Sequence, residues 1–270
     1  MHDVFSKSNR QKNNFQPENV VVKVIGMVPA RYASSRMPGK PLALISGKSM
    51  IQRVVEQSSQ AKVLDEVWVA TDDSRIAEAV EHFGGKAVMT SPDCASGTDR
   101  LAQAIELVEG DIIVNVQGDQ PFIDPLMIDE TVGPMLEDES LQMATLIHPI
   151  HRQEDLEDPG VVKAVIDLAG NGMYFSRSLI PAPHNDVAHQ VYEHVGLYAY
   201  RRDFLKTLAI LPQTVLERVE GLEQLRVIEH GYRLRCVITA CADNELSGFS
   251  IDTPEDVLRG EAMLQERGLE

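Results

Sequence analysis

VVKVIGMVPARYASSRMPGKPL (residues 21–42) is the stretch from which the fold can be predicted, because an apolar run passes directly into a basic loop. The run 21–30 is rich in β-branched and other apolar residues, which predicts a buried strand. The loop at 29–40 mixes Pro, Gly, Ser and basic residues, so it offers many N–H and hydroxyl donors. In open α/β sheets, ligands bind beyond the carboxyl ends of the strands, where this loop is expected to lie.

Outward from this stretch, apolar runs alternate with segments of helical period. Strands are predicted at 66–71 and 111–117, and a helix is predicted over about 49–61. Three sets of residues recur with helical spacing and predict the buried faces of three helices: Ile51, Val54, Val55 and Ser58; Ile76, Ala79, Val80 and Phe83; and Leu101, Ala104, Ile105 and Val108. Strands and helices that alternate at this length predict an α/β fold, a three-layer sandwich with a mainly parallel mixed sheet.

The second half of the chain is less regular. Strands, several of them antiparallel, are predicted at 143–150, 161–167, 172–177, 190–201 and 232–240, and helices at about 215–230 and 253–266. Thr253 as the N-cap, Pro254 at the first helical position and an acid three residues after the cap favour a helix start. With no repeat or linker, we predict a disordered extension over 1–20 and one domain over 21–270 with an inserted β subregion.

Charge and composition exclude several classes of protein. The 25 basic and 41 acidic residues give a net charge of −16, which argues against nucleic-acid binding through bulk electrostatics. The sequence has no apolar run of about 18 residues, so no membrane span is predicted. Residues 1–20 also lack the apolar core of a secretory signal. Cys94, Cys236 and Cys241 lack metal or redox spacing, which fits a reducing compartment. We therefore expect a cytoplasmic protein with no nucleic-acid partner and no membrane insertion.

The charge of residues 19–55 is opposite in sign to the net charge of the chain. Between Glu18 and Glu56 the chain has no acidic residue, and three of the basic residues in this interval, Arg31, Arg36 and Lys40, lie in the loop after the first strand. Basic side chains beside free backbone donors predict a cradle for a polyphosphate. The alternative is a solvated basic loop without a ligand.

Two carboxylates follow predicted strands at the same edge of the sheet. Asp119 stands just past the strand at 111–117, and Asp252 immediately precedes a predicted helix. Because Mg²⁺ is usually held by one or two carboxylates plus substrate phosphates, these two residues are candidate ligands if the fold brings them together. The alternative is that each aspartate only shapes a turn or caps a helix.

Eight segments, taken in order, resemble one family. They are PARYASSRMPGKPL (29–42), ATDD (70–73), SGTDRLA (96–102), VNVQGDQP (114–121), YFSR (174–177), HVGLYAYR (194–201), LEQLR (222–226) and IDTPEDV (251–257). Together they resemble the CMP-Kdo synthetases, which are 3-deoxy-manno-octulosonate (Kdo) cytidylyltransferases, over about 22–266. The resemblance implies a nucleotide-diphospho-sugar transferase (GT-A-like) fold, a homodimer, and Mg²⁺-dependent transfer of CMP from CTP to the anomeric hydroxyl of Kdo for lipopolysaccharide synthesis.

The resemblance also assigns site residues. It implies that Arg31, Ser34 and Lys40 hold the triphosphate, that Asp119 and Asp252 carry the metal, and that Arg31 and Lys40 act in catalysis together with these two acids. The implied contacts to the nucleotide are Thr71, Asp72, Ser96, Gly97, Arg100 and Gln117, and the implied contacts to the sugar acid are Gln120, Arg177, His194, Tyr198, Glu223 and Gln224.

Some of these residues have plainer interpretations. Arg100 and Arg177 would also fit surface ion pairs, and Tyr198 would fit the core because it lies in an alternating strand. Glu223 and Gln224 are neighbours on a predicted helix, so they do not share a face, and one of them is expected to be only solvated.

Three features differ from the commoner form of the family. Gln120 stands where an acid is typical, Gly248 lies four residues before Asp252 rather than two, and the stretch between Arg177 and His194 is short. Similar features occur in a branch that uses 8-amino-Kdo, so both sugars stay open, and replacing Glu by Gln does not by itself favour an ammonium group. A sialic-acid or methylerythritol-phosphate cytidylyltransferase and a catalytically silent nucleotide-sugar-binding protein also stay open.

Overall fold

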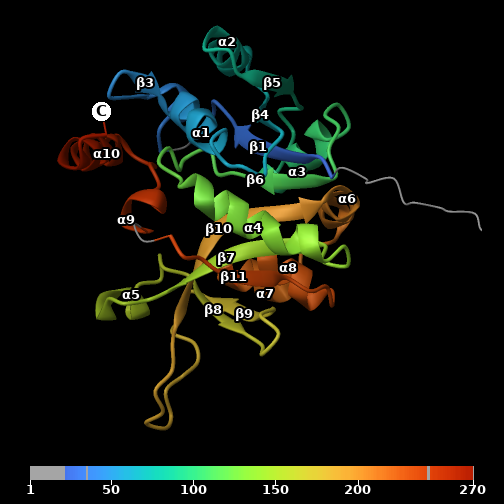
Figure 1. The fold of residues 1–270 in the computed structure, drawn as a ribbon, viewed down its shortest axis with the longest axis vertical. Coiled ribbons are helices and arrows are strands. Elements are labelled where there is room, and N and C mark those ends of the chain that lie inside the picture. The colour runs from blue at the N-terminus through green and yellow to red at the C-terminus, as the bar shows by residue number, and fades with distance from the viewer. Residues whose placement is uncertain (1–21, 35, 242–243, 270) are drawn as a thin grey trace, which may run out of the picture.

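The computed structural model describes residues 22–34, 36–241 and 244–269. The extension predicted over 1–20 lies outside these ranges. Within them, nine strands form one mixed sheet in the order β11-β7-β10-β6-β1-β4-β5, with β8 pairing with β10 and β9 with β8 (Figure 1). The strands are β1 Val24–Ala30, β4 Glu66–Thr71, β5 Lys86–Met89, β6 Ile112–Asn115, β7 Met143–Pro149, β8 Lys163–Ile166, β9 Gly172–Ser176, β10 Tyr192–Arg201 and β11 Arg235–Ile238.

The sheet changes character between its two halves. Strand β1 pairs in parallel with both β4 and β6, and β4 pairs in parallel with β5. Strand β10 runs antiparallel to β6, β7 and β8, whereas β11 is parallel to β7. Because β10 is antiparallel, its amino-terminal end lies at the same edge of the sheet as the carboxyl ends of β1 and β6. Both halves of the sheet therefore contribute residues to one edge.

Alternate residues of β1 pack into two different cores. Val24 and Val28 belong to a cluster with apolar residues of α1, α2 and α4, whereas Ile25 and Met27 belong to a cluster with α3, α6 and α8. The chain thus folds as the predicted three layers, with helices on both faces of the sheet. The helices named here are α1 Met50–Ser58, α2 Ser74–His82, α3 Gly97–Ala104, α4 Pro125–Glu137, α6 Arg202–Ile210 and α8 Gln224–Glu229.

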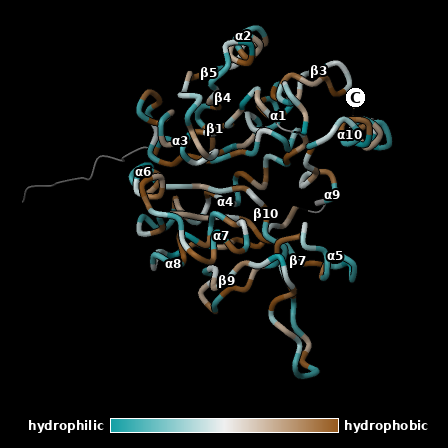
Figure 2. The backbone as a smooth tube through the Cα atoms, turned by 180° about the vertical axis from the view of Figure 1, so that it is seen from behind, coloured by the Kyte–Doolittle hydropathy of each residue, from teal (hydrophilic) through white to brown (hydrophobic). Residues whose placement is uncertain are grey.

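The remaining elements are shorter or lie at the sheet edge. They are the 3-10 turn η1 Lys40–Leu42, the hairpin of β2 Leu44–Ile45 and β3 Lys48–Ser49, and the helices α5 Gln153–Glu157, α7 Val215–Glu220, α9 Asn244–Ser247 and α10 Pro254–Arg267. In the tube of Figure 2, helices such as α2 and α10 alternate between hydrophilic and hydrophobic colours along their turns. The long connection from β9 to β10 extends away from the sheet at the bottom of Figure 1, and its residues 181–190 are exposed.

Most predicted elements are confirmed, including the strand at 66–71. Thr253 caps α10 in a capping box with Asp256, with Pro254 in the first turn, as predicted. The single helix predicted over about 215–230 is wrong: α7 ends at Gly221, which adopts φ 64°, and α8 begins three residues later. A left-handed glycine ends a helix because it turns the chain out of the helical path.

Four helices, α4, α5, α6 and α9, are not predicted by the sequence pattern. Pro134 lies inside α4 and is a residue that usually breaks a helix, although Asp124 caps the helix and Pro125 occupies its first turn. Among the described residues, no helix is both long and apolar enough to cross a membrane.

Candidate active site

The loops that follow β1 and β6 meet at the carboxyl edge of the parallel strands. A Cβ at Gly118 would lie 2.7 Å from the carbonyl oxygen of Pro29, so the two loops approach more closely than any other residue type would allow. The amide of Ile251 donates to the carbonyl oxygen of Asp119 at 2.9 Å, which ties the segment before α10 to the same edge. Three segments far apart in sequence therefore line one pocket.

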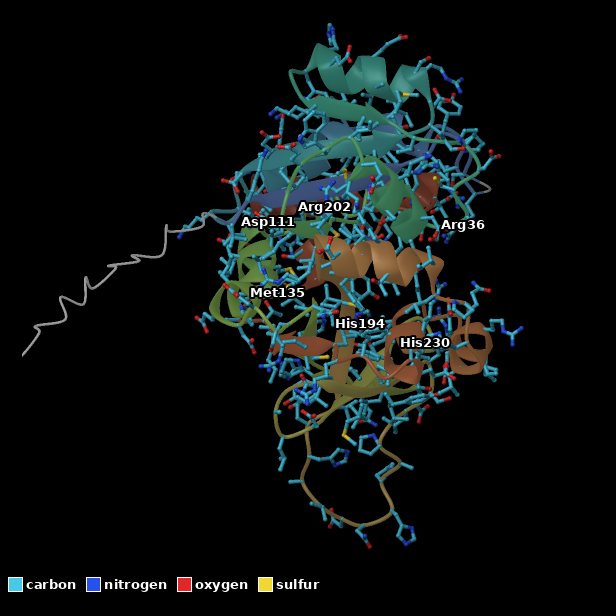
Figure 3. All side chains as sticks on the ribbon, turned by 90° about the vertical axis from the view of Figure 1, so that its right-hand side faces the viewer. Arg36, Asp111, Met135, His194, Arg202 and His230 are labelled. Atoms are coloured by element: carbon cyan, nitrogen blue, oxygen red, sulfur yellow. The ribbon has the colours of Figure 1, made fainter. Side chains whose placement is uncertain are left out.

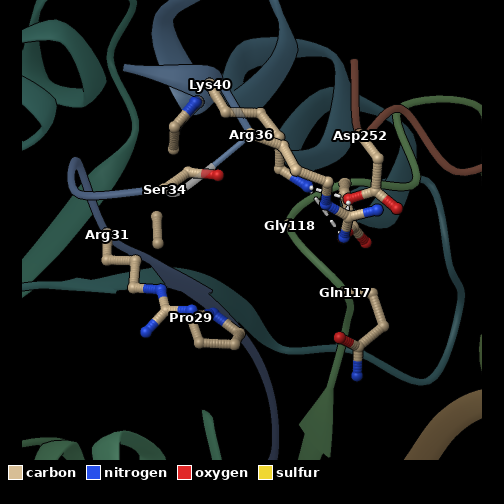
Figure 4. Close-up of a pocket in the computed structure, with 11 residues that line it drawn as sticks. Pro29, Arg31, Ser34, Arg36, Lys40, Gln117, Gly118 and Asp252 are labelled. Atoms are coloured by element: carbon tan, nitrogen blue, oxygen red, sulfur yellow. Dashed lines mark hydrogen bonds and ion pairs between the residues drawn. The ribbon is translucent and has the colours of Figure 1, made fainter. Parts of the chain in front are cut away.

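This pocket, the first pocket, is open and polar (Figure 4). It is lined by Pro29, Ala30, Arg31, Ser34, Arg36, Lys40, Pro41, Gln117, Gly118, Asp119 and Asp252. The structure thus brings together the residues predicted for the triphosphate, the two predicted metal ligands and Gln117.

Tyr32 anchors the loop that carries Arg31 and Ser34. The Arg75 guanidinium lies over the Tyr32 ring, 3.4 Å from its centroid, and a Cβ at Gly39 would lie 3.1–3.2 Å from the atoms of the same ring. Gly39 has φ 73°, a conformation that a glycine adopts without strain. The ring is thus held between α2 and the loop's own backbone, which limits where Arg31 can point.

Cations and carboxylates converge on one side of the first pocket. The Lys40 ammonium lies 3.0 Å from Asp119 Oδ2 and 3.0 Å from Asp252 Oδ1, and Arg36 Nη2 lies 2.9 Å from the same Asp252 oxygen. Arg31 lies across the pocket from this cluster (Figure 4), and over 22–34, 36–241 and 244–269 no carboxylate forms an ion pair with it. An exposed guanidinium without a carboxylate partner is available to bind an anion.

Arg36 belongs to the basic loop that the sequence predicts to bind a polyphosphate, but the family resemblance assigns it no role in the site. The sequence places it only in the basic loop, whereas in the structure it lines the first pocket and contacts Asp252. The signal is present in the sequence, because Arg36 belongs to the same loop as Arg31 and Lys40.

The two carboxylates fit a divalent cation. A positive charge, the Lys40 ammonium, already lies within 3.0 Å of one oxygen of each aspartate. No group of three or more His, Cys, Asp or Glu side chains suited to a metal occurs in the described part of the chain, so the protein itself offers two carboxylates here. This donor set matches Mg²⁺, which commonly takes one or two carboxylates and completes its shell with phosphate oxygens and water.

A second pocket adjoins the first. Pro29, Ala30 and Arg31 line both, and the second pocket is completed by Cys94, Ala95, Ser96, Gly97 and Arg100. Ser96 caps α3 in a capping box, so this pocket opens at the amino-terminal end of a helix. Three of the residues predicted to surround the nucleoside thus lie here, next to the residues predicted for its phosphates.

Arg100 is a buried member of this pocket. Its guanidinium donates to Asp72 Oδ2 at 2.9 Å and to Thr90 Oγ1 at 2.6 Å. The surface ion pair considered for Arg100 is therefore wrong: the pair exists, but it is nearly enclosed. Thr71 is fully buried and lines neither pocket, and its hydroxyl accepts a hydrogen bond from the Asp73 amide.

Three residues predicted for the sugar acid, His194, Tyr198 and Gln224, form a hydrogen-bonded group between β10 and α8, and a fourth, Glu223, lies beside it. Tyr198 donates to Gln224 Oε1 at 3.1 Å, and Gln224 Nε2 lies 3.3 Å from His194 Nδ1. The neighbouring Glu223 accepts a hydrogen bond from Thr98 in α3 at 2.6 Å. The expectation that Glu223 or Gln224 is only solvated is wrong, because α8 begins between them and both side chains find partners.

Burial shifts the protonation of this group. It lowers the pKa of His194 from 6.5 to about 3, so the imidazole is neutral. Burial also raises the pKa of the Glu223 carboxyl, and the hydrogen bond from Thr98 acts in the opposite direction. His194, Tyr198, Glu223 and Gln224 form what we call the acceptor end of the site. It therefore carries less charge than the ordinary pKa values of these side chains would give.

Two further predicted residues lie apart from this group. The Arg177 guanidinium is exposed and donates to the carbonyl oxygens of Glu220 and Pro159, and among the described residues no hydrogen bond joins it to His194. Gln120 is buried, and its Oε1 has no hydrogen-bond donor within the described part of the structure. Their contacts with a sugar stay predictions.

Curated relatives match nearly the whole chain. The 3-deoxy-manno-octulosonate cytidylyltransferase of Syntrophotalea carbinolica is 49% identical over 92% of this chain and 100% of its own length. The 8-amino-3,8-dideoxy-manno-octulosonate cytidylyltransferase of Shewanella piezotolerans is 50% identical over 88% of this chain and 97% of its own. The two kinds of relative are thus about equally similar.

Solved structures support the same relationship. A CMP:2-keto-3-deoxy-manno-octonic acid synthetase in complex with CTP matches with a TM-score of 0.85 and 44% identity, covering 91% of this chain and 99% of that chain, which confirms the predicted nucleotide-diphospho-sugar transferase-like fold. The 4-diphosphocytidyl-2C-methyl-D-erythritol synthase of Anaerococcus prevotii has a TM-score of 0.59 at 15% identity, which shows the fold alone. A family model described as cytidylyltransferase matches residues 25–235, and together with the relatives it shows that this chain belongs to the CMP-Kdo synthetase family of cytidylyltransferases.

Proposed function

We propose that this protein transfers CMP from CTP to the anomeric hydroxyl of Kdo, releasing pyrophosphate and activating the sugar for lipopolysaccharide synthesis. The observation that carries the proposal is the meeting of a basic loop and two carboxylates in one open pocket, beside a second pocket at the start of α3. The related structure in complex with CTP supports the choice of nucleotide.

The nucleotide end would bind CTP across the two pockets. Ser96, Gly97 and Arg100 would surround the nucleoside, with Asp72 holding Arg100 in place. Arg31 lines both pockets and is thus suited to the phosphates between them. Thr71 would act by supporting the strand end rather than by touching the nucleotide, because it is fully buried.

Asp119 and Asp252 would hold Mg²⁺ beside the triphosphate. When bound, the metal supplies charge stabilisation and makes the attacking hydroxyl easier to deprotonate. Lys40 and Arg36, which pair with these carboxylates here, would then be available to the phosphates. Their charges would stabilise the departing pyrophosphate.

The transfer itself needs no covalent intermediate on the protein. The anomeric oxygen forms a bond to the α-phosphorus as the bond to the pyrophosphate oxygen breaks, and the hydroxyl proton is released. The protein therefore acts by placing the two substrates in line and by offsetting charge. His194, Tyr198, Glu223, Gln224, Gln120 and Arg177 would hold the sugar acid, with Arg177 suited to its carboxylate.

8-Amino-Kdo is a second candidate acceptor. The buried Gln120 Oε1 lacks a donor within the described residues, and an amino group on the sugar would supply one. The Shewanella piezotolerans relative, which by name acts on the 8-amino sugar, is as similar as the Kdo enzymes. A hydroxyl would supply a donor as well, so the two sugars differ by little at this atom.

The setting of the enzyme is also part of the proposal. We propose a cytoplasmic homodimer in which residues 21–270 act as one cytidylyltransferase domain, with neither nucleic-acid nor membrane partners. Exposed apolar side chains of the inserted β region, Leu168 and Met173, support a subunit contact there. Sedimentation of the purified protein tests the dimer.

Pyrophosphate release tests the activity. The protein is incubated with CTP and Mg²⁺ together with Kdo, with 8-amino-Kdo, or with no sugar. We expect release only when a sugar is present, with a clear preference for one of the two. A Gln120→Glu variant, run in parallel, should change this preference if Gln120 contacts the sugar. CTP binding without pyrophosphate release with either sugar would contradict the proposal and favour a silent nucleotide-sugar-binding protein.

A further inference from the structure

A bulge interrupts β10 where it passes the candidate acceptor end. The pairing of β10 with β7 shifts register between Val195 and Tyr198, and the β7 residue opposite Tyr198 is Thr145. Thr145 is fully buried, and its Oγ1 lies 2.8 Å from the Leu197 carbonyl oxygen and 3.2 Å from that of Val195. One hydroxyl therefore faces both carbonyl groups that the bulge turns toward it.

These distances fix the direction of the hydrogen bonds. A carbonyl oxygen can only accept, so the single hydrogen of the Thr145 hydroxyl points toward the bulge. His194 Nε2 lies 3.0 Å from the same Oγ1, which must then accept from it. The His194 ring is neutral, so its hydrogen is on Nε2 and its Nδ1 is an acceptor.

The order continues to the far end of the group. Because Nδ1 accepts, Gln224 presents its Nε2 to it, at 3.3 Å, and its Oε1 is left to accept from the Tyr198 hydroxyl at 3.1 Å. The Tyr198 oxygen, having donated its only hydrogen, can accept from a ligand, whereas the second Nε2 hydrogen of Gln224 can donate to one. Each polar atom offered to the ligand thus has one role.

We infer that Thr145 is a positioning residue for the acceptor sugar, because its hydroxyl sets the direction of the hydrogen bonds through His194, Gln224 and Tyr198. The inference rests on the proposed function, in which these three side chains hold the sugar acid. Thr145 itself touches the bulge and the imidazole, and acts on the sugar only through them.

Removal of the Thr145 hydroxyl leaves the direction of these hydrogen bonds undefined. Thr145→Val keeps the shape of the side chain but removes the acceptor for His194 Nε2 and the donor for the two bulge carbonyl groups. The imidazole is then free to carry its hydrogen on Nδ1, and the Gln224 amide is free to turn over. Thr145→Ser keeps the hydroxyl and is expected to restore the order.

The matched control is Thr131→Val. Thr131 is also fully buried and donates its hydroxyl hydrogen to a carbonyl oxygen, that of Met127, but within α4. The same substitution there removes one buried hydroxyl without touching the acceptor group.

The experiment measures KM for each substrate in the full-length protein and records the ¹⁵N NMR signals of the imidazoles. Thr145→Val is expected to raise KM for the preferred sugar by about tenfold, which corresponds to the loss of one hydrogen bond, and to change KM for CTP by less than about twofold. Thr145→Ser and Thr131→Val should keep the wild-type values. The wild type and Thr145→Ser should show a His194 signal for hydrogen on Nε2, which Thr145→Val loses.

Failure of the inference and failure of the proposed function are distinguishable. A wild type inactive with both sugars refutes the function, while the NMR spectrum still tests the role of Thr145. Unchanged sugar KM in a folded Thr145→Val protein, or an equal rise in both KM values, overturns the inference. If Thr145→Val does not fold, hydrogen on Nδ1 of His194 in the wild type overturns it just as directly.

Discussion

At the nucleotide end of the site, Arg31, Arg36 and Lys40 reach from one loop into an open pocket, whereas at the acceptor end His194 and Gln224 are packed between β10 and α8. In Figure 3, Arg36 lies in the upper half of the molecule and His194 in the lower half. The first region presents charges to solvent. The second joins mainly neutral side chains to one another through hydrogen bonds.

This difference suits the two ligands. A triphosphate has a high charge, so long basic side chains from one loop bind it through charge-assisted hydrogen bonds. A sugar acid is recognised largely through its hydroxyl groups, which requires donors and acceptors fixed in direction. Ion pairs at the nucleotide end are therefore expected to matter for activity, and those beneath the acceptor end for stability.

The largest expected effect is on catalysis, from Asp119→Asn. Loss of one metal-binding carboxylate should reduce kcat by roughly 10³-fold, because the metal contributes several kcal/mol of charge stabilisation. The thermal midpoint should change little, since the Asp119 pair with Lys40 lies in the open pocket. Pyrophosphate release and thermal unfolding measure the two quantities. The control is Glu255→Gln, which changes an exposed acid near Asp252 and should leave kcat unchanged. Full activity of Asp119→Asn would show that Asp119 does not bind the metal.

Glu217→Gln should have the opposite outcome. Glu217 lies 2.5 Å from Arg226, and the two side chains are only 6% and 8% exposed. Breaking such a pair leaves a buried charge, so the free energy of unfolding should fall by about 3–5 kcal/mol in urea denaturation. Glu106→Gln breaks an exposed pair with Lys206 and should leave the urea midpoint unchanged. Equal midpoints for both variants would contradict the contrast between the two ends of the site.

Arg31→Gln sharpens the contrast within the basic loop. Arg31 lines both pockets and forms no ion pair among the described residues, so its loss should raise KM for CTP by about tenfold, with unchanged stability. Lys48→Gln is the control, because Lys48 belongs to the same basic stretch but pairs with Glu56 at 2.6 Å. The idea fails if both variants raise KM for CTP alike.

The smallest effect, counted per pH unit, concerns the acceptor end. Between pH 6.5 and about 3, the unfolded chain binds a proton at His194 that the folded protein does not, so stability falls as the pH is lowered through this window. The side chains that contact the ring, Thr145, Gln224, Phe175 and Tyr198, are uncharged. Relative to His194→Gln, the wild type should lose about 1 kcal/mol per pH unit below pH 6.5 in urea titrations. His230→Gln, at an exposed position, should behave as the wild type, and parallel curves for all three proteins would refute the shift.

Prediction from sequence succeeds where the signal is local. The strand at 66–71 and the buried faces of α1 and α3 follow from periodicity, since each residue's burial depends on its place in a regular element. Periodicity does not predict the helices α4 and α6 or the break at Gly221. Pro134 usually breaks a helix but lies inside α4, and α7 ends because Gly221 adopts the left-handed conformation, a local signal that an apolar period does not contain.

The candidate site divides in the same way. Arg31, Lys40, Asp119 and Asp252 stand out in the sequence because charge and position after a strand are local properties, and the structure places all four in the first pocket. Thr145 has no such signal, since a threonine in a strand is ordinary until its neighbours are known.

We can infer the layered α/β architecture, the basic loop after β1 and the family from the sequence alone, because these depend on residue types and their order along the chain. Three features become visible only in the folded protein: Ile251 ties Asp252 to Asp119, Asp72 encloses Arg100, and Thr145 orders the hydrogens around His194. Such contacts join residues that lie far apart in the sequence. Their energy depends on burial and on hydrogen-bond direction, and neither can be inferred from the type of a single residue.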